Sequence, residues 1–182
     1  IAIKIYKIDS NTSRGIKSYI LGDPRFKKIP RNTARIINLW ASKEFKNLKR
    51  AFKSGLAVPE PYHVRNNILL MQFIGFGAIP APKLKDIKTL SNPLETFDSI
   101  LHFIKDLYQD ANLVHGDLSE FNILYHNKKP LVIDISQAVS NQHPKAEYFL
   151  VRDIKNVFYF FEKIGVTPPD PEKFYYDVID VT

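Results

Sequence analysis

The sequence predicts an α+β fold of two lobes around one cleft. Along the chain, a strand, a helix and a hairpin are followed by a Gly/Pro-rich linker, and then by a helix, a second hairpin and another long helix. The length of 182 residues suits one compact domain or two small lobes. The 45% of hydrophobic and 13% of aromatic residues are typical of a protein with a packed core.

The first element is a strand that opens the sequence with "IAIKIYKI". Apolar and polar residues alternate, which places Ala2, Lys4 and Tyr6 on one face and the isoleucines on the other. Because this alternation starts at Ile1, we expect further chain upstream of it. Residues 10–32 then combine Gly, Pro, Asn and many basic residues without a sustained period, so we expect a long, flexible basic loop.

A helix is predicted from Thr33 to Lys53. Gly55 suits its end, because glycine readily adopts the left-handed conformation found there. The inward face follows the spacing i, i+3, i+7, i+11, i+14 and consists of Ile37, Trp40, Glu44, Leu48 and Ala51. One carboxylate therefore lies on an otherwise apolar stripe.

Turn-forming residues delimit the remaining elements. Asn66-Asn67 divides two strands of a hairpin, and residues 75–86 read as an irregular linker between the lobes. Pro93 occupies the first position of a helix, and residues 143–165 form another, with the short strands "NILYH" and "LVIDI" between them. The apolar stripe of the helix that begins at Pro93 comprises Leu94, Phe97, Leu101, Ile104, Leu107 and Tyr108.

Composition and charge narrow the class of protein. The sequence has no cysteine, which excludes disulfides and cysteine-ligated metals, and it has no apolar run of membrane-spanning length. We therefore expect a cytoplasmic protein without a membrane partner. The net charge of +7 is uneven: residues 1–53 carry 14 basic and three acidic residues, and the remainder carries 12 basic and 16 acidic ones. This asymmetry fits either a polyanionic partner or a solvated basic surface.

The residues that carry chemistry gather in "LVHGDLSEFNILYHNKKPLVIDIS". A carboxylate at Asp117 could accept the proton of an attacking hydroxyl, while the oxygens of Asn122 and Asp134 suit Mg²⁺ on nucleotide phosphates. We expect His115 to brace the loop rather than to titrate. Asp and Asn are ordinary turn formers, but all four residues in this order, each at a strand edge, favour a phosphoryl-transfer site.

A second pair of residues supports this interpretation. Lys4 lies in the opening strand, and Glu44 lies on the inward face of the next helix. A strand lysine paired with a helix carboxylate orients the α and β phosphates in kinases. Alone, the two residues would read as exposed charges. Upstream of the Asp117 loop, and in this order, they predict an ion pair.

In these motifs the chain resembles the RIO family of atypical serine/threonine protein kinases, in its first, archaeal-type branch rather than its second. The resemblance covers residues 1 to about 165 and rests on "LVHGDLSEFNILYHN", "VIDISQAV", "LLMQFIG", "IPAPKL" and "HPKAEYFLVRDIKN". Ser136 stands where ordinary kinases have the Gly of Asp-Phe-Gly. The HGDL pattern alone indicates only the superfamily, whereas "DLSEFN" and "IDISQAV…HP" make the resemblance specific.

The resemblance implies a two-lobed protein-kinase-like fold with a truncated C-lobe of the RIO type. The N-lobe would span residues 1–76, including the flexible basic loop, and the C-lobe would span residues 77–182. Met71 would lie at the back of the adenine pocket, and the backbone of Gln72 and Ile74 would form the hinge. The family's Gly-rich phosphate loop and winged-helix module, which precede the first lysine, have no counterpart in this sequence.

The resemblance also implies a role for each polar site residue. Lys4 would contact the ATP phosphates and pair with Glu44, and Asp117 would be the catalytic carboxylate. Asn122 and Asp134 would be the metal ligands. Asp134 is in addition a candidate acceptor of the phosphate as an aspartyl-phosphate.

The implied function is that of an ATP-dependent protein serine kinase or ATPase in small ribosomal subunit maturation. Its cofactors would be ATP and Mg²⁺, with Mn²⁺ as an alternative metal. Its partners would be the pre-small ribosomal subunit and ribosomal RNA, and we expect a monomer. Two alternatives stay open: a small-molecule phosphotransferase that shares the HGDL loop, and a catalytically weak, ribosome-binding ATP switch.

Asp153 is an acid within an apolar stretch of the last long helix. We expect it to be buried beneath the catalytic loop, with its carboxylate accepting backbone N–H bonds near His115. The alternative is an exposed aspartate paired with Arg152 or Lys155.

The basic loop carries Tyr19 and Phe26 between its charges, which suits phosphate contacts together with stacking on unpaired bases. We expect Lys27, Lys28 and Arg31 to contribute to RNA binding. The alternative is a purely local role, in which the loop clamps the nucleotide phosphates or docks onto its own lobe.

Overall fold

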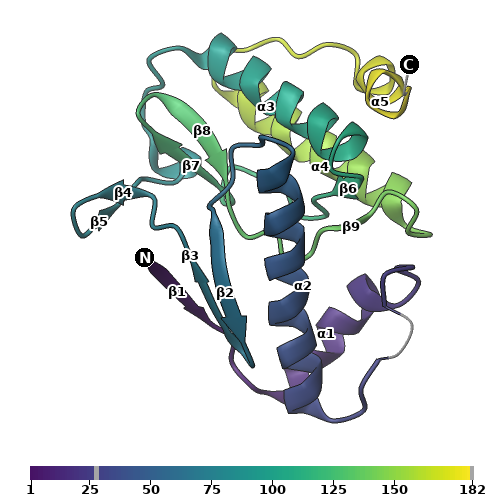
Figure 1. The fold of residues 1–182 in the computed structure, drawn as a ribbon. Coiled ribbons are helices and arrows are strands. Elements are labelled where there is room, and N and C mark those ends of the chain that lie inside the picture. The colour runs from purple at the N-terminus through teal and green to yellow at the C-terminus, as the bar shows by residue number, and fades with distance from the viewer. Residues whose placement is uncertain (27–28, 181–182) are drawn as a thin grey trace.

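The computed structural model describes residues 1–26 and 29–180, with the backbone alone for residues 11–14 and 18. The first half of the chain builds a three-stranded antiparallel sheet in the order β1-β3-β2 beside one long helix (Figure 1). Helix α2 packs on β2 and β3, and α1 packs on α2. These elements are β1 (Ala2–Ile5), α1 (Ser10–Ile20), α2 (Thr33–Lys53), β2 (Pro61–Arg65) and β3 (Ile68–Met71).

The second half is mainly helical, with α5 packed on α3 and α4 (Figure 1). Three two-stranded sheets pair β4 with β5, β6 with β9 and β7 with β8. No helix in the described part of the chain is both long enough and apolar enough to span a membrane. The elements are β4 (Gly75–Phe76), β5 (Ile79–Pro80), η1 (Leu84–Asp86), α3 (Pro93–Gln109), β6 (Leu113–Val114), β7 (Ile123–His126), β8 (Lys129–Val132), β9 (Val139–Ser140), α4 (Ala146–Lys163) and α5 (Pro171–Ile179).

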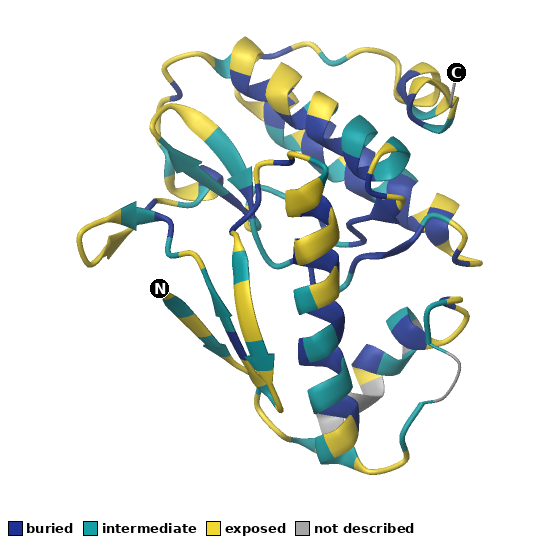
Figure 2. Cartoon of the chain, in the orientation of Figure 1, coloured by how far each residue is buried: buried dark blue, intermediate teal, exposed yellow. Residues whose placement is uncertain are grey.

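Helix α2 begins and ends where the sequence predicts. The side chain of Asn32 caps it by accepting a hydrogen bond from the backbone N–H of Arg35, and Gly55 follows its end with a φ of 78°. A buried stripe runs along the helix beside an exposed one (Figure 2). The buried residues include all five predicted ones: Ile37, Trp40, Glu44, Leu48 and Ala51. The stripe carries Glu44 toward the sheet.

The predicted basic loop over residues 10–32 is wrong in its first part, because residues 10–20 form the helix α1. Ile16 and Ile20 lie one turn apart and are buried against α2. Two isoleucines among polar residues are too short a stripe to indicate a helix from sequence, since packing against a neighbour stabilises such a helix more than its own propensity does. Residues 27–28 of the predicted loop lie outside the described residues.

The predicted irregular linker over residues 75–86 contains the β4–β5 hairpin and the turn η1. Gly75 permits this hairpin, because a Cβ at that position would lie 2.2 Å from the carbonyl oxygen of Ile79. The predicted stripe of α3 is wrong at Leu94, which is 61% exposed. Ile100 and Phe103 are buried instead, so the inward face is rotated from the predicted one.

Helix α5 was not predicted. Asp170 caps it by accepting a hydrogen bond from the backbone N–H of Lys173 at 2.8 Å. Phe174 and Val178, one turn apart, are its buried residues. As in α1, two apolar residues one turn apart do not predict a helix by themselves, because the helix is stabilised by the surface on which they pack.

Helix α4 holds the loop between β6 and β7 from beneath. The backbone N–H of Gly116 donates to Oδ2 of Asp153 at 2.7 Å, and that of Leu118 donates to Oδ1 at 2.9 Å. Arg152 donates to the carbonyl of Gly116, and Asn156 donates to the carbonyl of Leu118. The predicted burial of Asp153 is confirmed, at 2% exposure. Three side chains of one helix thus satisfy the peptide groups on both sides of residue 117.

Replacing Asp153 by Asn should lower the free energy of unfolding by about 1–3 kcal/mol. An amide offers one acceptor oxygen and turns its NH₂ group toward the second N–H donor, which is left without a partner. Denaturant unfolding of the wild type and of Asp153→Asn tests this, with the exposed Asp98→Asn on α3 as the matched control. Equal stability of the two variants would contradict this account of the loop.

The difference in stability between the wild type and Asp153→Asn should depend on pH. Burial raises the pKa of Asp153 from its ordinary value of 3.8 to about 7, although the two backbone N–H bonds and Arg152 oppose the rise. Between these values the folded protein binds more protons than the unfolded chain, so this carboxyl contributes stability at acidic pH that is lost as the pH rises to about 7. Asn lacks this titration, so the deficit of Asp153→Asn should shrink between about pH 4 and about pH 7.

Candidate active site

Lys4 lies between two carboxylates from distant parts of the chain. Its Nζ is 3.1 Å and 2.9 Å from the two carboxylate oxygens of Glu44, and 2.7 Å from Oδ1 of Asp134. The structure thus contains the predicted Lys4–Glu44 ion pair and adds Asp134 to it. Glu44 is only 1% exposed, so its charge requires a cation. The isoleucines on the opposite face of β1 are exposed: Ile1, Ile3 and Ile5.

The three charges shift one another's pKa values. Burial opposes the charged form of Lys4, but the carboxylates of Glu44 and Asp134 outweigh it and raise the pKa. Burial raises the pKa of Glu44 to about 7, against the effect of Lys4. At Asp134 burial is outweighed by Lys4 and by the Ser136 hydroxyl, which lower the pKa. Asp134 is therefore an anion at neutral pH, beside a charged lysine.

Asp117 is the second carboxylate of the site. Gln137 Nε2 donates to its Oδ2 at 2.9 Å. Asn122 Nδ2 donates to its backbone carbonyl at 2.9 Å and lies 3.4 Å from Oδ2. Burial raises the pKa of Asp117, although Arg152 opposes the rise. Within the described residues nothing donates to Oδ1, which leaves one carboxylate oxygen to accept a proton.

His115 lies behind this loop and is 1% exposed. The backbone N–H of Asp117 donates to its Nδ1 at 3.3 Å, and its Nε2 lies 3.4 Å from the carbonyl oxygen of Ile133. Burial lowers the pKa of His115 to about 4, so the ring is neutral at physiological pH. This geometry agrees with a bracing role between the two loops.

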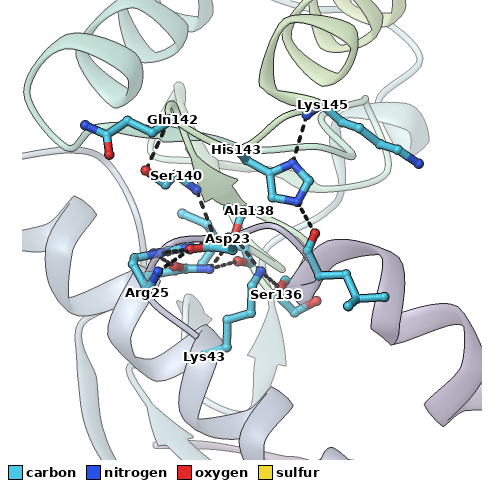
Figure 3. A network of polar contacts seen from close by, with 12 residues as sticks. Asp23, Arg25, Lys43, Ser136, Ala138, Ser140, Gln142, His143 and Lys145 are labelled. Carbon is cyan, nitrogen blue, oxygen red and sulfur yellow. Dashed lines mark hydrogen bonds and ion pairs between the residues drawn. The ribbon is translucent and has the colours of Figure 1, made fainter. Parts of the chain in front are cut away.

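The backbone turns sharply at Asp134, whose φ of 57° lies in the left-handed region. For a residue with a Cβ this conformation costs on the order of 1 kcal/mol and needs support from the surroundings. Lys43 of α2 supplies part of that support (Figure 3). Its Nζ donates to the carbonyl oxygens of Ser136 at 2.8 Å and of Ala138 at 2.5 Å.

Two more side chains hold the same segment. Asn47 Nδ2 donates to the carbonyls of Ile135 at 2.9 Å and of Ala138 at 3.0 Å. Arg25 Nη2 lies 3.4 Å from the carbonyl oxygen of Ala138, and the guanidinium also binds Asp23. We call Arg25, Lys43 and Asn47 the carbonyl clamp. None of these three residues, nor Gln137, was predicted from the sequence. The clamp binds main-chain carbonyls that are distant in sequence, and Gln137 binds the side chain of Asp117 from another loop.

A cavity of about 520 Å³ opens beside Lys4 and Asp134. Met71, Gln72 and Ile74 also line it, together with residues from the β4–β5 hairpin, η1 and β7. The structure thus brings five of the predicted site residues to one cavity. Three others do not line it. Glu44 is buried behind Lys4, and Asp117 and Asn122 belong to the loop of Asp117.

The backbone at Gln72 and Ile74 has unused hydrogen-bonding groups. The N–H of Gln72 donates to the carbonyl of Glu60 at 2.8 Å, and the carbonyl of Ile74 accepts from the N–H of Ala81 at 3.0 Å. In the described part of the chain no group binds the carbonyl of Gln72 or the N–H of Ile74. One acceptor and one donor therefore remain at the cavity, which is what the edge of an adenine ring requires.

Asn122 and Asp134 also fit a hard metal ion. The amide nitrogen of Asn122 is bound to Asp117, which leaves Oδ1 without a donor among the described residues, and Oδ2 of Asp134 is likewise unused. No group of three or more His, Asp or Glu side chains in the described ranges is placed to hold a metal. Mg²⁺ is typically bound by one or two protein oxygens together with water and phosphate oxygens, so these two ligands suit it when a nucleotide is present.

The RIO domain family model matches residues 1–174. The RIO-type serine/threonine-protein kinase Rio1 of Haloferax volcanii is 39% identical over 165 residues, which are 91% of this chain and 56% of the relative. Rio1 of Methanocaldococcus jannaschii is 42% identical over 162 residues, which are 89% and 55%. Serine/threonine-protein kinase RIO3 of Mus musculus is 42% identical over 169 residues, which are 91% and 33%. The chain thus spans little more than half the length of the two Rio1 relatives and a third of the length of RIO3.

Solved structures agree with the sequence relatives. The ADP/Mg²⁺–phosphoaspartate complex of the Rio2 kinase from Chaetomium thermophilum matches with a TM-score of 0.72 at 25% identity, over 97% of this chain and 52% of that one. The predicted α+β kinase-like fold is confirmed by this match, and the predicted resemblance is confirmed by the family model and the Rio1 relatives. The chain belongs to the RIO domain family.

Proposed function

We propose that this chain is the ATP-binding and phosphoryl-transfer part of a RIO-type protein serine/threonine kinase or ATPase. The observation that carries the proposal is the meeting of Lys4, Glu44 and Asp134 at the wall of a cavity whose lining also contains Gln72 and Ile74. Phosphates would lie at the charged wall, and adenine would bind the free carbonyl and N–H groups.

Each residue then has a defined task. Lys4, fixed by Glu44, binds the phosphates, while Asn122 and Asp134 hold Mg²⁺. The metal neutralises charge on the phosphates when it is bound. Asp117 accepts the proton of the attacking hydroxyl, and burial, which raises its pKa, makes it a stronger base than an exposed aspartate.

Asp134 is also a candidate acceptor of the phosphate itself. In that reaction a carboxylate oxygen of Asp134 forms a bond to the γ-phosphorus, the bond to the β–γ bridging oxygen breaks, and ADP leaves. The solved complex of Rio2 supports this proposal, because it contains ADP, Mg²⁺ and a phosphoaspartate. Hydrolysis of the aspartyl-phosphate would complete an ATPase cycle.

Asp134→Ala should abolish the Mg²⁺-dependent part of ATP binding, because it removes the charged metal ligand. We expect the affinity measured with Mg²⁺ to fall at least about tenfold. Titration of fluorescent ATP into the full-length protein, with Mg²⁺ or with EDTA, measures the effect, and Asp98→Ala is the exposed control. Unchanged affinity with Mg²⁺ would refute the assignment of Asp134.

Asp117→Asn should leave Mg-ATP binding nearly intact and lower turnover roughly 10²-fold, as expected for the loss of a positioned base. ATP hydrolysis and autophosphorylation are the measurements. A wild type that binds Mg-ATP but has the same low turnover as the mutant would favour the alternative of a catalytically weak ATP switch. Transfer to a small molecule in preference to protein would favour the phosphotransferase.

The partner that we propose is RNA of the pre-small ribosomal subunit, and the surface that supports it lies on α2. Four cations at positions i, i+3, i+4 and i+7 are exposed and line a hollow of about 350 Å³ with Ser54: Lys46, Lys49, Arg50 and Lys53. The one carboxylate of α2, Glu44, is buried. None of the four cations forms an ion pair within the described residues.

The arrangement of these cations is not explained by the helix itself. Arg50 and Lys53 lie in the last turn, where cations are favourable at the negative end of the helix dipole. Lys46 and Lys49 lie further in, and the like-charged pairs at i, i+4 repel each other. An external polyanion such as an RNA backbone would relieve that repulsion.

Replacing all four cations by Gln should reduce the salt dependence of binding to small-subunit RNA by a log–log slope of about 3, because fewer counterions are released. ATP affinity should stay unchanged. Binding measured over a salt series tests this, against a control that removes the same charge elsewhere: Lys128, Lys155, Lys163 and Lys173 to Gln. Parallel slopes of the four-residue variant and the wild type would exclude this surface.

A further inference from the structure

We propose that Arg25 is a positioning residue for Asp134, acting through the peptide segment of residues 135–138. The inference rests on the proposed function, since it concerns the residue proposed to bind the metal. Arg25 lies between α1 and α2, far in sequence from the catalytic and metal-binding loops. The kinase pattern in the sequence gives it no role.

Arg25 is held in one orientation by several partners (Figure 3). Its Nε lies 2.8 Å from Oδ1 of Asp23 and its Nη2 lies 2.6 Å from Oδ2, so the pair is bidentate. Its Nη1 donates to Oδ1 of Asn47 at 2.8 Å. The side chain of Asp23 is fully buried, and Arg25 is its ion-pair partner. Arg25 thereby orients the amide of Asn47, whose nitrogen binds the carbonyls of Ile135 and Ala138.

The segment that carries Arg25 is docked onto the chain that follows Asp134. The backbone N–H of Ser140 lies 3.4 Å from Oδ2 of Asp23. Nε2 of His143 lies 2.9 Å from the carbonyl oxygen of Leu21, while its Nδ1 accepts from the N–H of Lys145. These contacts fix the segment that carries Arg25 relative to the chain that follows Asp134.

In the segment of residues 135–138, the carbonyls of Ile135, Ser136 and Ala138 accept from the clamp, while the side chains of Ser136 and Gln137 contact the site. Ser136 Oγ donates to Oδ1 of Asp134 at 2.8 Å, and Gln137 Nε2 donates to Oδ2 of Asp117 at 2.9 Å. A shift of this segment would therefore move contacts of both carboxylates. Because Asp134 holds a left-handed φ, which is costly for a residue with a Cβ, the turn depends on the donors to these carbonyls as well as on the contact of Asp134 with Lys4.

Arg25→Ala should weaken Mg-ATP binding about tenfold, which is typical for a residue that orients a metal ligand. ATP binding in EDTA should change less than about twofold, because the adenine contacts do not involve this segment. Hydrogen–deuterium exchange of the amides of residues 135–138 should accelerate in the nucleotide-free protein. Arg25→Lys should show the same effects more weakly, since an ammonium cannot bind Asp23, Asn47 and Ala138 together.

The full-length protein is used throughout, with the exposed Arg65→Ala as a charge-matched control that should behave as wild type. Equal losses with Mg²⁺ and with EDTA, or exchange at residues 135–138 that is unchanged, would overturn the proposal. Should Arg25→Ala fail to fold, Arg25→Lys carries the same test. A wild type without any Mg²⁺-dependent ATP binding would refute the proposed function, while faster exchange at residues 135–138 in the variant would still establish the clamp.

Discussion

The burial of Glu44 is the constraint from which the site follows. A carboxylate that is 1% exposed on an apolar helix face needs a cation, and Lys4 of the edge strand β1 meets that need at 2.9 Å. The orientation of β1 then follows, because the face of the strand that carries Lys4 must turn toward α2 and the isoleucines of the other face are left exposed. Asp134 joins the same lysine from a third element, so one ammonium connects the sheet, the helix and the loop after β8.

Both segments that carry the proposed catalytic and metal-binding residues depend on side chains that bind their peptide groups from behind. Neither segment is part of a regular helix or sheet, and buried N–H and C=O groups without partners are costly. Helix α4 supplies donors and acceptors on both sides of Asp117, and the carbonyl clamp does so behind Asp134. The charged groups are thus held by two helices that belong to different halves of the chain, and Gln137 links the two supports.

Local patterns account for what could be predicted from the sequence. Helix α2 could be predicted from the apolar stripe that repeats along its 21 residues. The turn of the β2–β3 hairpin could be predicted from Asn66, whose φ is 53°, and the start of α3 from its proline. Asp153 could be predicted because a charge inside an apolar stripe demands a partner. In contrast, α1 and α5 each have two buried side chains among those that the structure describes, and Lys43 reads as an ordinary surface lysine although it is fully buried. The two helices are stabilised by the helices on which they pack, and Lys43 binds carbonyls more than 90 residues further along the chain.

A single structure of the nucleotide complex tests the proposed arrangement of the site. A crystal structure with Mg²⁺ and a non-hydrolysable ATP analogue should place the adenine edge on the carbonyl of Gln72 and the N–H of Ile74. The phosphates should lie at Lys4, with the Lys4–Glu44 pair retained and the metal bound by Asn122 and Asp134. A nucleotide bound outside this cavity, or a metal held by other residues while Lys4 keeps its contact with Asp134, would contradict the account.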